Sequence, residues 1–140
     1  MLKPNFTGRW KFNPKRSSLE IPPPDSAIFV VEHREPIVRL SRTHIIGGKS
    51  DSFEINLTTD GKEVEVAREG LKIRARAYWE DDTLVFDSHV SRGDQEGSNI
   101  VRYTLNDTHD SFVGQEQFRS QNLNYDNIWV LERQRTEGDN

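Results

Sequence analysis

The side chains best suited to chemistry are polar residues that alternate with apolar ones along predicted β-strands. Those predicted to point into one apolar interior are Arg42, His44, Tyr103 and Glu116. Arg42 and His44 follow Val38 and Leu40 at even spacing, and every second side chain of a strand lies on the same face. A guanidinium, an imidazole, a phenol and a carboxylate that converge in an apolar interior can orient a small ligand. The alternative is that Arg42 and His44 lie at a wet rim, with Glu116 paired to one of them.

Aromatic residues are predicted to form walls of the same interior: Trp79, Tyr103 and Trp129. Three small residues, Ala75, Ala77 and Gly114, are predicted to face inward beside them, and they leave volume for a cavity. In a packed barrel, however, small residues also match large ones on the opposite wall. The sequence is therefore compatible with a cavity and with a filled interior.

Catalysis by these residues would use Glu116 or His44 as a general acid or base, as an isomerase or cyclase requires. A serine hydrolase is not indicated, because the sequence contains no Gly-x-Ser-x-Gly. The four histidines lack the spacing of a metal site, although Asp87 and His89 share a predicted strand face. We predict no metal ligand and no cofactor, and enzymatic activity stays open.

The composition fits a single domain of 140 residues, spanning 1–140, with one modest core. A hydrophobic fraction of 33% beside a charged fraction of 30% is typical of strands with one solvated face. The formal charge of −4 gives no overall attraction for phosphate backbones, so no nucleic-acid partner is predicted.

The sequence gives few indications of the compartment. The absence of cysteine excludes disulfides and thiol chemistry and fits any compartment. No apolar run approaches the roughly 20 residues of a membrane helix, so no membrane span is predicted. The N-terminus has no apolar signal region, which indicates a soluble, cytoplasmic protein as given, or a periplasmic one if a signal peptide was removed.

Turn residues divide the chain into about ten short segments that are predicted strands. Their ranges are 6–12, 27–34, 37–44, 51–58, 62–67, 71–80, 83–91, 99–105, 111–119 and 127–135. Residues 13–25, with Pro22, Pro23 and Pro24, are predicted to cross one end of the fold as an extended linker. Asp60-Gly61 is the strongest hairpin signal and is predicted to join the strands on either side of it.

Connections this short join antiparallel neighbours, so the predicted topology is a meander. We therefore predict an all-β, antiparallel up-and-down meander of about ten strands closed into a barrel, which hides its apolar face and its edges. An open sheet or a two-sheet sandwich is the alternative. Two inward faces are ambiguous. In one strand Phe29 and Val31 compete with Ile28 and Val30, and in the other Leu84 and Phe86 compete with Val85.

Both ends of the chain carry a recognisable pattern. Gly8 and Trp10 lie in the first predicted strand, and the last reads Trp129-Val130-Leu131-Glu132-Arg133. These ends resemble those of the calycin superfamily, which includes lipocalins and fatty-acid-binding proteins, and the layout is most similar to small bacterial lipocalin-like proteins. The resemblance implies a lipocalin-like barrel closed by Gly8, Trp10 and Arg133, with the arginine over the indole face, where a cation is attracted.

The sequence departs from these families in features that bear on the ligand. Residues 13–25 leave no room for the two-helix lid of fatty-acid-binding proteins, and the last strand lacks their Arg-x-Tyr carboxylate clamp. No histidine follows His109, whereas haem-binding barrels of similar shape carry their iron ligand near the C-terminus. Neither a fatty acid nor haem is therefore supported as the ligand.

These features together predict that the barrel binds a small, mostly apolar or amphipathic molecule and serves as a carrier or sensor. One alternative is a structural or interaction module with a filled barrel, which could form a homodimer through an exposed strand edge. The other is an isomerase or cyclase on the same scaffold that uses a buried Glu or His.

Overall fold

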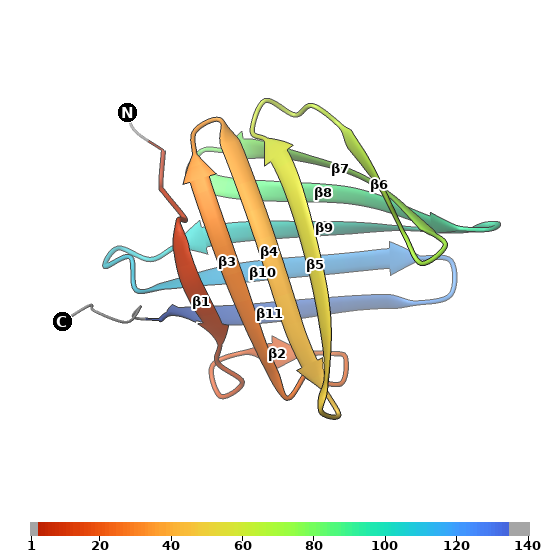
Figure 1. Ribbon diagram of the computed structural model, residues 1–140, viewed down its shortest axis with the longest axis horizontal. Coiled ribbons are helices and arrows are strands. Elements are labelled where there is room, and N and C mark those ends of the chain that lie inside the picture. The colour runs from red at the N-terminus through yellow and green to blue at the C-terminus, as the bar shows by residue number, and fades with distance from the viewer. Residues whose placement is uncertain (1–2, 135–140) are drawn as a thin grey trace.

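The computed structural model describes residues 3–134, which form one antiparallel β-sheet curved into a nearly closed barrel (Figure 1). Its strands are β1 (Gly8–Phe12), β2 (Ser18–Leu19), β3 (Ser26–Arg34), β4 (Ile37–Ile46), β5 (Lys49–Thr58), β6 (Val64–Arg68), β7 (Leu71–Glu80), β8 (Thr83–Arg92), β9 (Gln95–Leu105), β10 (Ser111–Ser120) and β11 (Asn124–Arg133). The predicted all-β antiparallel barrel is confirmed. Within residues 3–134 there is no helix long and apolar enough to cross a membrane.

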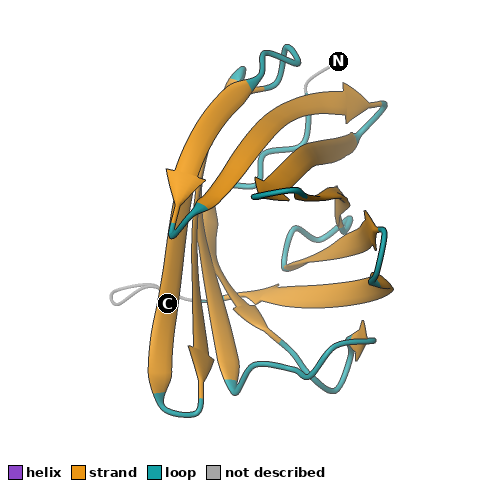
Figure 2. Cartoon of the chain, turned by 90° about the vertical axis from the view of Figure 1, so that its right-hand side faces the viewer, coloured by secondary structure: helices purple, strands orange, loops and turns teal. Residues whose placement is uncertain are grey.

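Strand β1 connects the two halves of the sheet. The hydrogen-bonded order is β5-β4-β3-β1-β11-β10-β9-β8-β7-β6, and β2 pairs with β11 outside this path. Trp10 of β1 lies opposite Phe29 of β3 on one side and opposite Arg133 of β11 on the other. Figure 2 shows how the strands curve round into facing layers as a result.

Strands β5 and β6 are the two edges of the sheet, and no backbone ladder joins them in the described part of the chain. We call the boundary between β5 and β6 the seam. Residues 59–63 cross the seam, and the N–H of Gly61 donates to the carbonyl of Ala77 on β7 (2.9 Å). The predicted Asp60-Gly61 hairpin is therefore wrong, because β5 pairs with β4 and β6 pairs with β7. Asp60 instead accepts a hydrogen bond from the N–H of Lys62 (3.0 Å) within this crossing.

The other predicted strands are present, with boundaries that differ by a few residues. Two predicted loops are shorter than expected, because hairpin pairing continues through polar residues: Arg92 pairs with Gln95, and Arg119 with Asn124. The short strand β2, which was not predicted, pairs with β11 just before the proline segment. Residue 135, the last of the final predicted strand, lies outside the described residues.

The inward faces meet in one core, which also resolves the two ambiguous strands. On β3, Phe29 and Val31 are buried, whereas Val30 is 37% exposed. On β8, Leu84 and Val85 are both buried, because a tyrosine and an arginine flank Val85 in register on the outer face. The largest fully buried side chains are Trp10, Phe112, Leu131, Val38, Val85 and Asn127.

Arg133 covers Trp10 at the junction of β1 and β11. The guanidinium carbon lies 4.2 Å from the centroid of the indole ring, a cation–π geometry. Its Nη1 donates to the carbonyl of Thr7 (3.0 Å) and its Nε donates to the carbonyl of His109 (2.8 Å). Gly8 lies directly beneath, with φ at +152°, and a Cβ at this position would be 2.5 Å from Nη1 of Arg133.

Replacing Gly8 therefore tests this junction. We expect Gly8→Ala to lower the free energy of unfolding by about 1–3 kcal/mol, because alanine rarely adopts this φ and its methyl group displaces the guanidinium from Trp10. Urea denaturation followed by tryptophan fluorescence measures the loss.

Gly48→Ala is the matched control for the cost of placing an alanine at a positive φ. Gly48 also has a positive φ, +79°, but no atom lies within 4 Å of the position that its Cβ would take. Gly48→Ala should lower the free energy of unfolding by less than Gly8→Ala does. Equal losses in the two variants would contradict a stabilising role for the Arg133–Trp10 contact.

Candidate functional site

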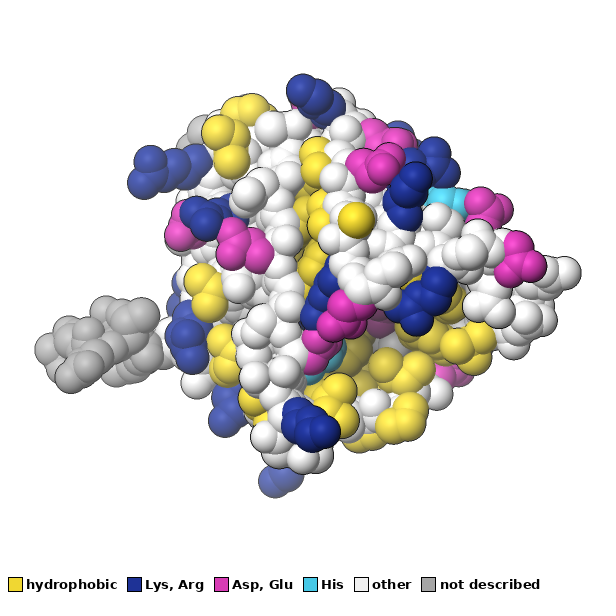
Figure 3. All heavy atoms as spheres, turned by 45° about the vertical axis from the view of Figure 1, so that its right-hand side comes forward, with side chains coloured by type: hydrophobic (Ala, Val, Ile, Leu, Met, Phe, Trp, Pro, Cys, Tyr) yellow, Lys and Arg dark blue, Asp and Glu magenta, His cyan; other side chains and the backbone are white. Residues whose placement is uncertain are grey.

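A cavity of about 280 Å³ lies inside the barrel beside the seam. Most of its wall is apolar, and includes Phe29, Leu40, Phe53, Ile73, Phe86, Val101 and Leu131. The polar side chains in the wall are Arg42, His44, Arg68, Ser88, Asn99, Tyr103 and Glu116. Figure 3 shows a recess in this face of the molecule, where apolar side chains are visible beside basic and acidic ones.

Most of the side chains that the sequence predicts as ligand-binding line this one cavity: Arg42, His44, Tyr103, Glu116 and Trp129. They come from β4 and from β9, β10 and β11. The last three are consecutive neighbours in the sheet, and the curvature of the sheet through β1 brings β4 to face them. Trp79 is not in the cavity wall. Its Nε1 donates to Oε2 of Glu35 (2.7 Å), and its ring lies 5.9 Å from that of His33.

The three small residues divide between the two expected roles. Ala75 lines the cavity and leaves space in it. Gly114 makes room for a large neighbour instead, since a Cβ there would lie 3.0 Å from Cε1 of Tyr103. Ala77 is fully buried and is not part of the cavity wall. The barrel is therefore packed around Gly114 and hollow beside Ala75.

Glu116 is held in the cavity wall by three N–H donors. Its Oε1 accepts from Nδ2 of Asn127 (2.8 Å) and from Nε1 of Trp129 (2.9 Å). Its Oε2 accepts from Nδ2 of Asn99 (3.0 Å). Asn127 lies opposite Glu116 in the β10–β11 ladder and is 1% exposed. A half-buried carboxylate is stabilised by such partners, and they fix its orientation.

Asn99 and Asn127 are site residues that the sequence reasoning missed. Both are the first residues of predicted strands, and the predicted inward sets begin two residues later, at Val101 and Trp129. The alternation contains the missing signal: Asn99 falls on the inward face of Val101 and Tyr103, and Asn127 on that of Trp129. Extending the period of two by one more step would have placed both amides inside.

His44 packs against Trp129, with ring centroids 5.7 Å apart and an angle of 28° between the planes. Burial, together with the nearby charge of Arg42, lowers the pKa of His44 to about 4, against the opposing effect of Asp51 and Glu116. The imidazole is therefore neutral at neutral pH. Its Nε2 is buried and has no hydrogen-bond partner in the described part of the chain.

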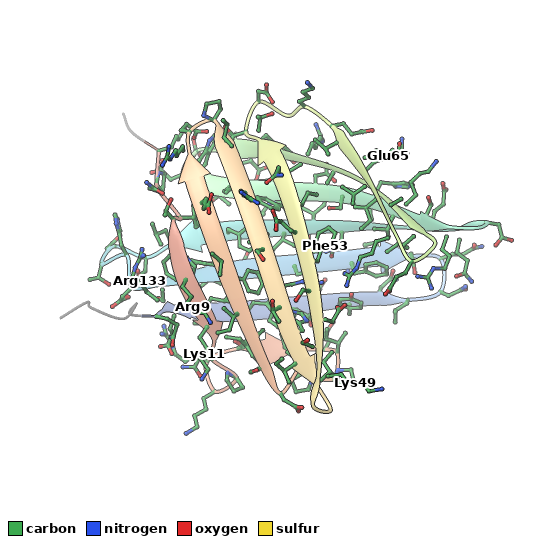
Figure 4. All side chains as sticks on the ribbon, viewed as in Figure 1. Arg9, Lys11, Lys49, Phe53, Glu65 and Arg133 are labelled. Carbon is green, nitrogen blue, oxygen red and sulfur yellow. The ribbon has the colours of Figure 1, made fainter. Side chains whose placement is uncertain are left out.

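Arg42 lies where the cavity meets the seam. Its guanidinium carbon is 5.8 Å from the ring centroid of Phe53, and its Nη2 is 3.7 Å from Oδ2 of Asp51. Asp51 on β5 also forms a close ion pair with Arg68 on β6, so one carboxylate serves two arginines across the seam. Burial lowers the pKa of Arg42, while Asp51 opposes that shift. Figure 4 shows Phe53 on β5, along this edge of the sheet.

Tyr103 supplies a hydroxyl that stays protonated. Burial raises its pKa, the charge of Glu116 raises it further, and Arg42 acts in the opposite direction. The ring meets Phe86 and Phe112 edge-on, at centroid distances of 5.3 and 5.6 Å. The hydroxyl can therefore donate or accept a hydrogen bond at any physiological pH.

Asp87 and His89, which share a strand face, pair with other charged side chains and do not form a common site. Asp87 forms an ion pair with Arg76 (2.8 Å), and Nε2 of His89 lies 3.5 Å from Glu96. Between residues 3 and 134, no three His, Asp or Glu side chains converge as metal ligands would.

Comparison with known proteins identifies the fold. No protein-family model matches the sequence, and no curated protein matches it. Among solved structures, secretory abundant heat soluble protein 4 from Ramazzottius varieornatus is similar, with a TM-score of 0.66, 15% identity, and coverage of 96% of this chain and 99% of that one. Human cRBP IV has a TM-score of 0.59 at 10% identity, covering 94% and 99%. A variant of the fluorescent protein UnaG has a TM-score of 0.56 at 11% identity, covering 94% and 97%. These similarities show the calycin-type fold and confirm the fold that the two ends of the sequence predict.

The neutral state of His44 predicts how stability depends on pH. In the unfolded chain the pKa of a histidine is about 6.5, so between about pH 6.5 and pH 4 the unfolded chain binds the extra proton. The free energy of unfolding should therefore fall as the pH drops from 7 to 5. Burial also lowers the pKa of His33, which contributes with the same sign. Urea denaturation at the two pH values measures the change.

His44→Gln isolates the contribution of His44. This variant should lose less stability between pH 7 and pH 5 than the wild-type protein, and His33 should account for the remainder. An unchanged difference between the two pH values would show that His44 is not the group responsible.

Proposed function

We propose that this protein binds a small, mostly apolar or amphipathic molecule inside its barrel and acts as a carrier or sensor. The observation that carries this proposal is the cavity of about 280 Å³, whose wall is mostly apolar and contains a few converging polar side chains. Ligand sites in proteins have this composition, and their volumes begin at about 300 Å³.

The shared fold supports the same function. Human cRBP IV is a cellular retinol-binding protein and has the same barrel architecture over 94% of this chain. At 10% identity its ligand does not transfer. What the likeness supports is a barrel used to enclose a small molecule.

The seam supplies a route into the cavity. Strands β5 and β6 share no backbone ladder, so the backbone hydrogen bond from Gly61 to Ala77 lies in the crossing segment and not between the two strands. Parting β5 from β6 therefore breaks no ladder between them. The ion pair between Asp51 and Arg68 is partly open to solvent, with the two side chains 49% and 26% exposed. An exposed ion pair contributes only about 0–1 kcal/mol, so parting these side chains costs little.

The two alternatives have less support. A filled barrel would leave no void beside Ala75, where the cavity lies. An isomerase or cyclase would need the oxygens of Glu116 to reach a proton of the substrate, and three N–H donors already occupy most of their acceptor sites. His44, with a pKa of about 4, also binds a proton weakly at neutral pH.

Filling the cavity tests the function. We expect Ala75→Phe to abolish binding of N-phenyl-1-naphthylamine, a neutral apolar probe, because the new ring occupies the void beside Ala75. In the wild-type protein the probe should quench tryptophan emission, since Trp129 lies in the cavity wall. Fluorescence titration measures both effects, and circular dichroism checks that the fold is retained.

Two variants serve as controls. Ala77→Phe places the same ring at a buried position outside the cavity, so it should destabilise the protein instead, by about 1–3 kcal/mol. Trp129→Phe should remove most of the quenching, whereas Trp79→Phe should preserve it. Unchanged probe affinity in a folded Ala75→Phe protein would refute binding in this cavity.

A further inference from the structure

The carboxylate of Glu116 dictates which way the amide of Asn99 points. Only the –NH₂ end of an amide can donate to a carboxylate, and Nδ2 of Asn99 lies 3.0 Å from Oε2 of Glu116. The reverse orientation would set two acceptors against each other. The carbonyl oxygen Oδ1 of Asn99 is therefore the free end of this amide, and it can only accept a hydrogen bond.

The part of the cavity wall formed by Asn99 and Glu116 has hydrogen-bond acceptors without donors. Oδ1 of Asn99 is buried and has no hydrogen-bond partner in the described part of the chain. A carboxylate has about four lone-pair sites, and Glu116 uses three of them, for Asn99, Asn127 and Trp129. The unused site belongs to Oε2, the oxygen that faces Asn99. A buried acceptor without a donor costs about 1–3 kcal/mol, which an incoming donor would recover.

The other polar side chains of the cavity do not supply the donor that these free acceptors lack. The hydroxyls of Ser88 and Tyr103 can donate or accept, and neutral His44 has one nitrogen of each kind. The two obligate donors in the cavity wall, Arg42 and Arg68, both lie at the seam, where each forms an ion pair with Asp51. Where Asn99 and Glu116 meet, the free groups are therefore hydrogen-bond acceptors, whereas the unpartnered Nε2 of His44 donates or accepts according to its tautomer.

Resting on the binding function proposed above, we propose that the ligand carries a hydrogen-bond donor, such as a hydroxyl or N–H group, on an apolar body. This donor is received by the free oxygens of Asn99 and Glu116. Molecules whose polar end only accepts, such as ethers and carboxylates, are discriminated against. The discrimination originates in Glu116, because its charge sets the orientation of Asn99.

Glu116→Gln should switch the polarity of the site. Its amide oxygen keeps the bonds from Asn127 and Trp129, which leaves the new –NH₂ group facing Asn99. The amide of Asn99 then turns over, so that its oxygen accepts from Gln at position 116 and its –NH₂ group takes the place of the free oxygen. The same pocket, with almost unchanged shape, would then offer a donor where it had offered an acceptor.

The experiment compares two neutral probes that have the same number of heavy atoms: 1-decanol, which can donate, and methyl nonyl ether, which cannot. Each displaces N-phenyl-1-naphthylamine from the wild-type protein at pH 7. We expect 1-decanol to bind about tenfold more tightly than the ether, the value of one recovered hydrogen bond. Decanoate should bind more weakly than 1-decanol. In Glu116→Gln the ratio between alcohol and ether should fall to about one.

Glu80→Gln is the charge-matched control, because Glu80 pairs with Arg102 on the outer surface (2.9 Å) and does not line the cavity. It should keep the tenfold ratio. Asn99→Leu provides a second route if Glu116→Gln does not fold. It removes the free oxygen of Asn99 but also the donor on Oε2 of Glu116, so two acceptor sites on Oε2 become free and the alcohol should keep at least its tenfold advantage over the ether.

The outcomes separate the two proposals. If N-phenyl-1-naphthylamine, 1-decanol and methyl nonyl ether all fail to bind the wild-type protein, the proposed binding function is refuted, and the donor preference that rests on it is refuted as well. If the probes bind but the ether or decanoate equals 1-decanol, only the donor preference is refuted. A tenfold ratio that persists in Glu116→Gln, or a ratio that falls to about one in Asn99→Leu, would also refute the assignment to this pair of residues.

Discussion

The structure depends on the double pairing of β1. This strand has a ladder on each side, to β3 and to β11, and through it the two ends of the chain become neighbours in one sheet. Arg133 fixes the junction by lying over Trp10 while its N–H groups reach two backbone carbonyls. Because the barrel is joined here, its unpaired edges fall on β5 and β6, and the cavity meets the surface between them.

The interior combines two requirements that usually conflict. Apolar packing around Trp10, Phe112 and Leu131 stabilises one part of the barrel, whereas the part beside Ala75 is left hollow. Polar groups are tolerated in the hollow part because one carboxylate organises them. Glu116 takes donors from β9 and β11 and so ties three consecutive strands together at side-chain level. The contacts that stabilise the Glu116 carboxylate in the wall also determine which hydrogen-bonding groups face the cavity.

Much of this arrangement could be predicted from the sequence, because a period of two is a local signal. It placed Arg42, His44, Tyr103 and Glu116 on inward faces, and all four line the cavity. The failures concern long-range relations. The turn chemistry of Asp60-Gly61 is real, but it cannot reveal that the flanking strands are opposite edges of the sheet. Trp79 lies on the inward-facing side of the alternation, but it is near the end of β7, where its indole N–H donates to Glu35 instead of lining the cavity.

The order of the strands has a consequence for how the chain closes. Followed from β6 through β11 to β1 and on to β5, the sheet is a simple meander in which, apart from β2, each strand pairs with its neighbour. In the native order, the first and last strands, β1 and β11, pair in the middle of this meander. Closing the sheet therefore requires residues as distant as Thr7 and Arg133, 126 positions apart, to meet. A circular permutant opened within residues 59–63 would turn this pairing into a hairpin contact. Its contact order would be lower, and faster folding would follow for the same final architecture.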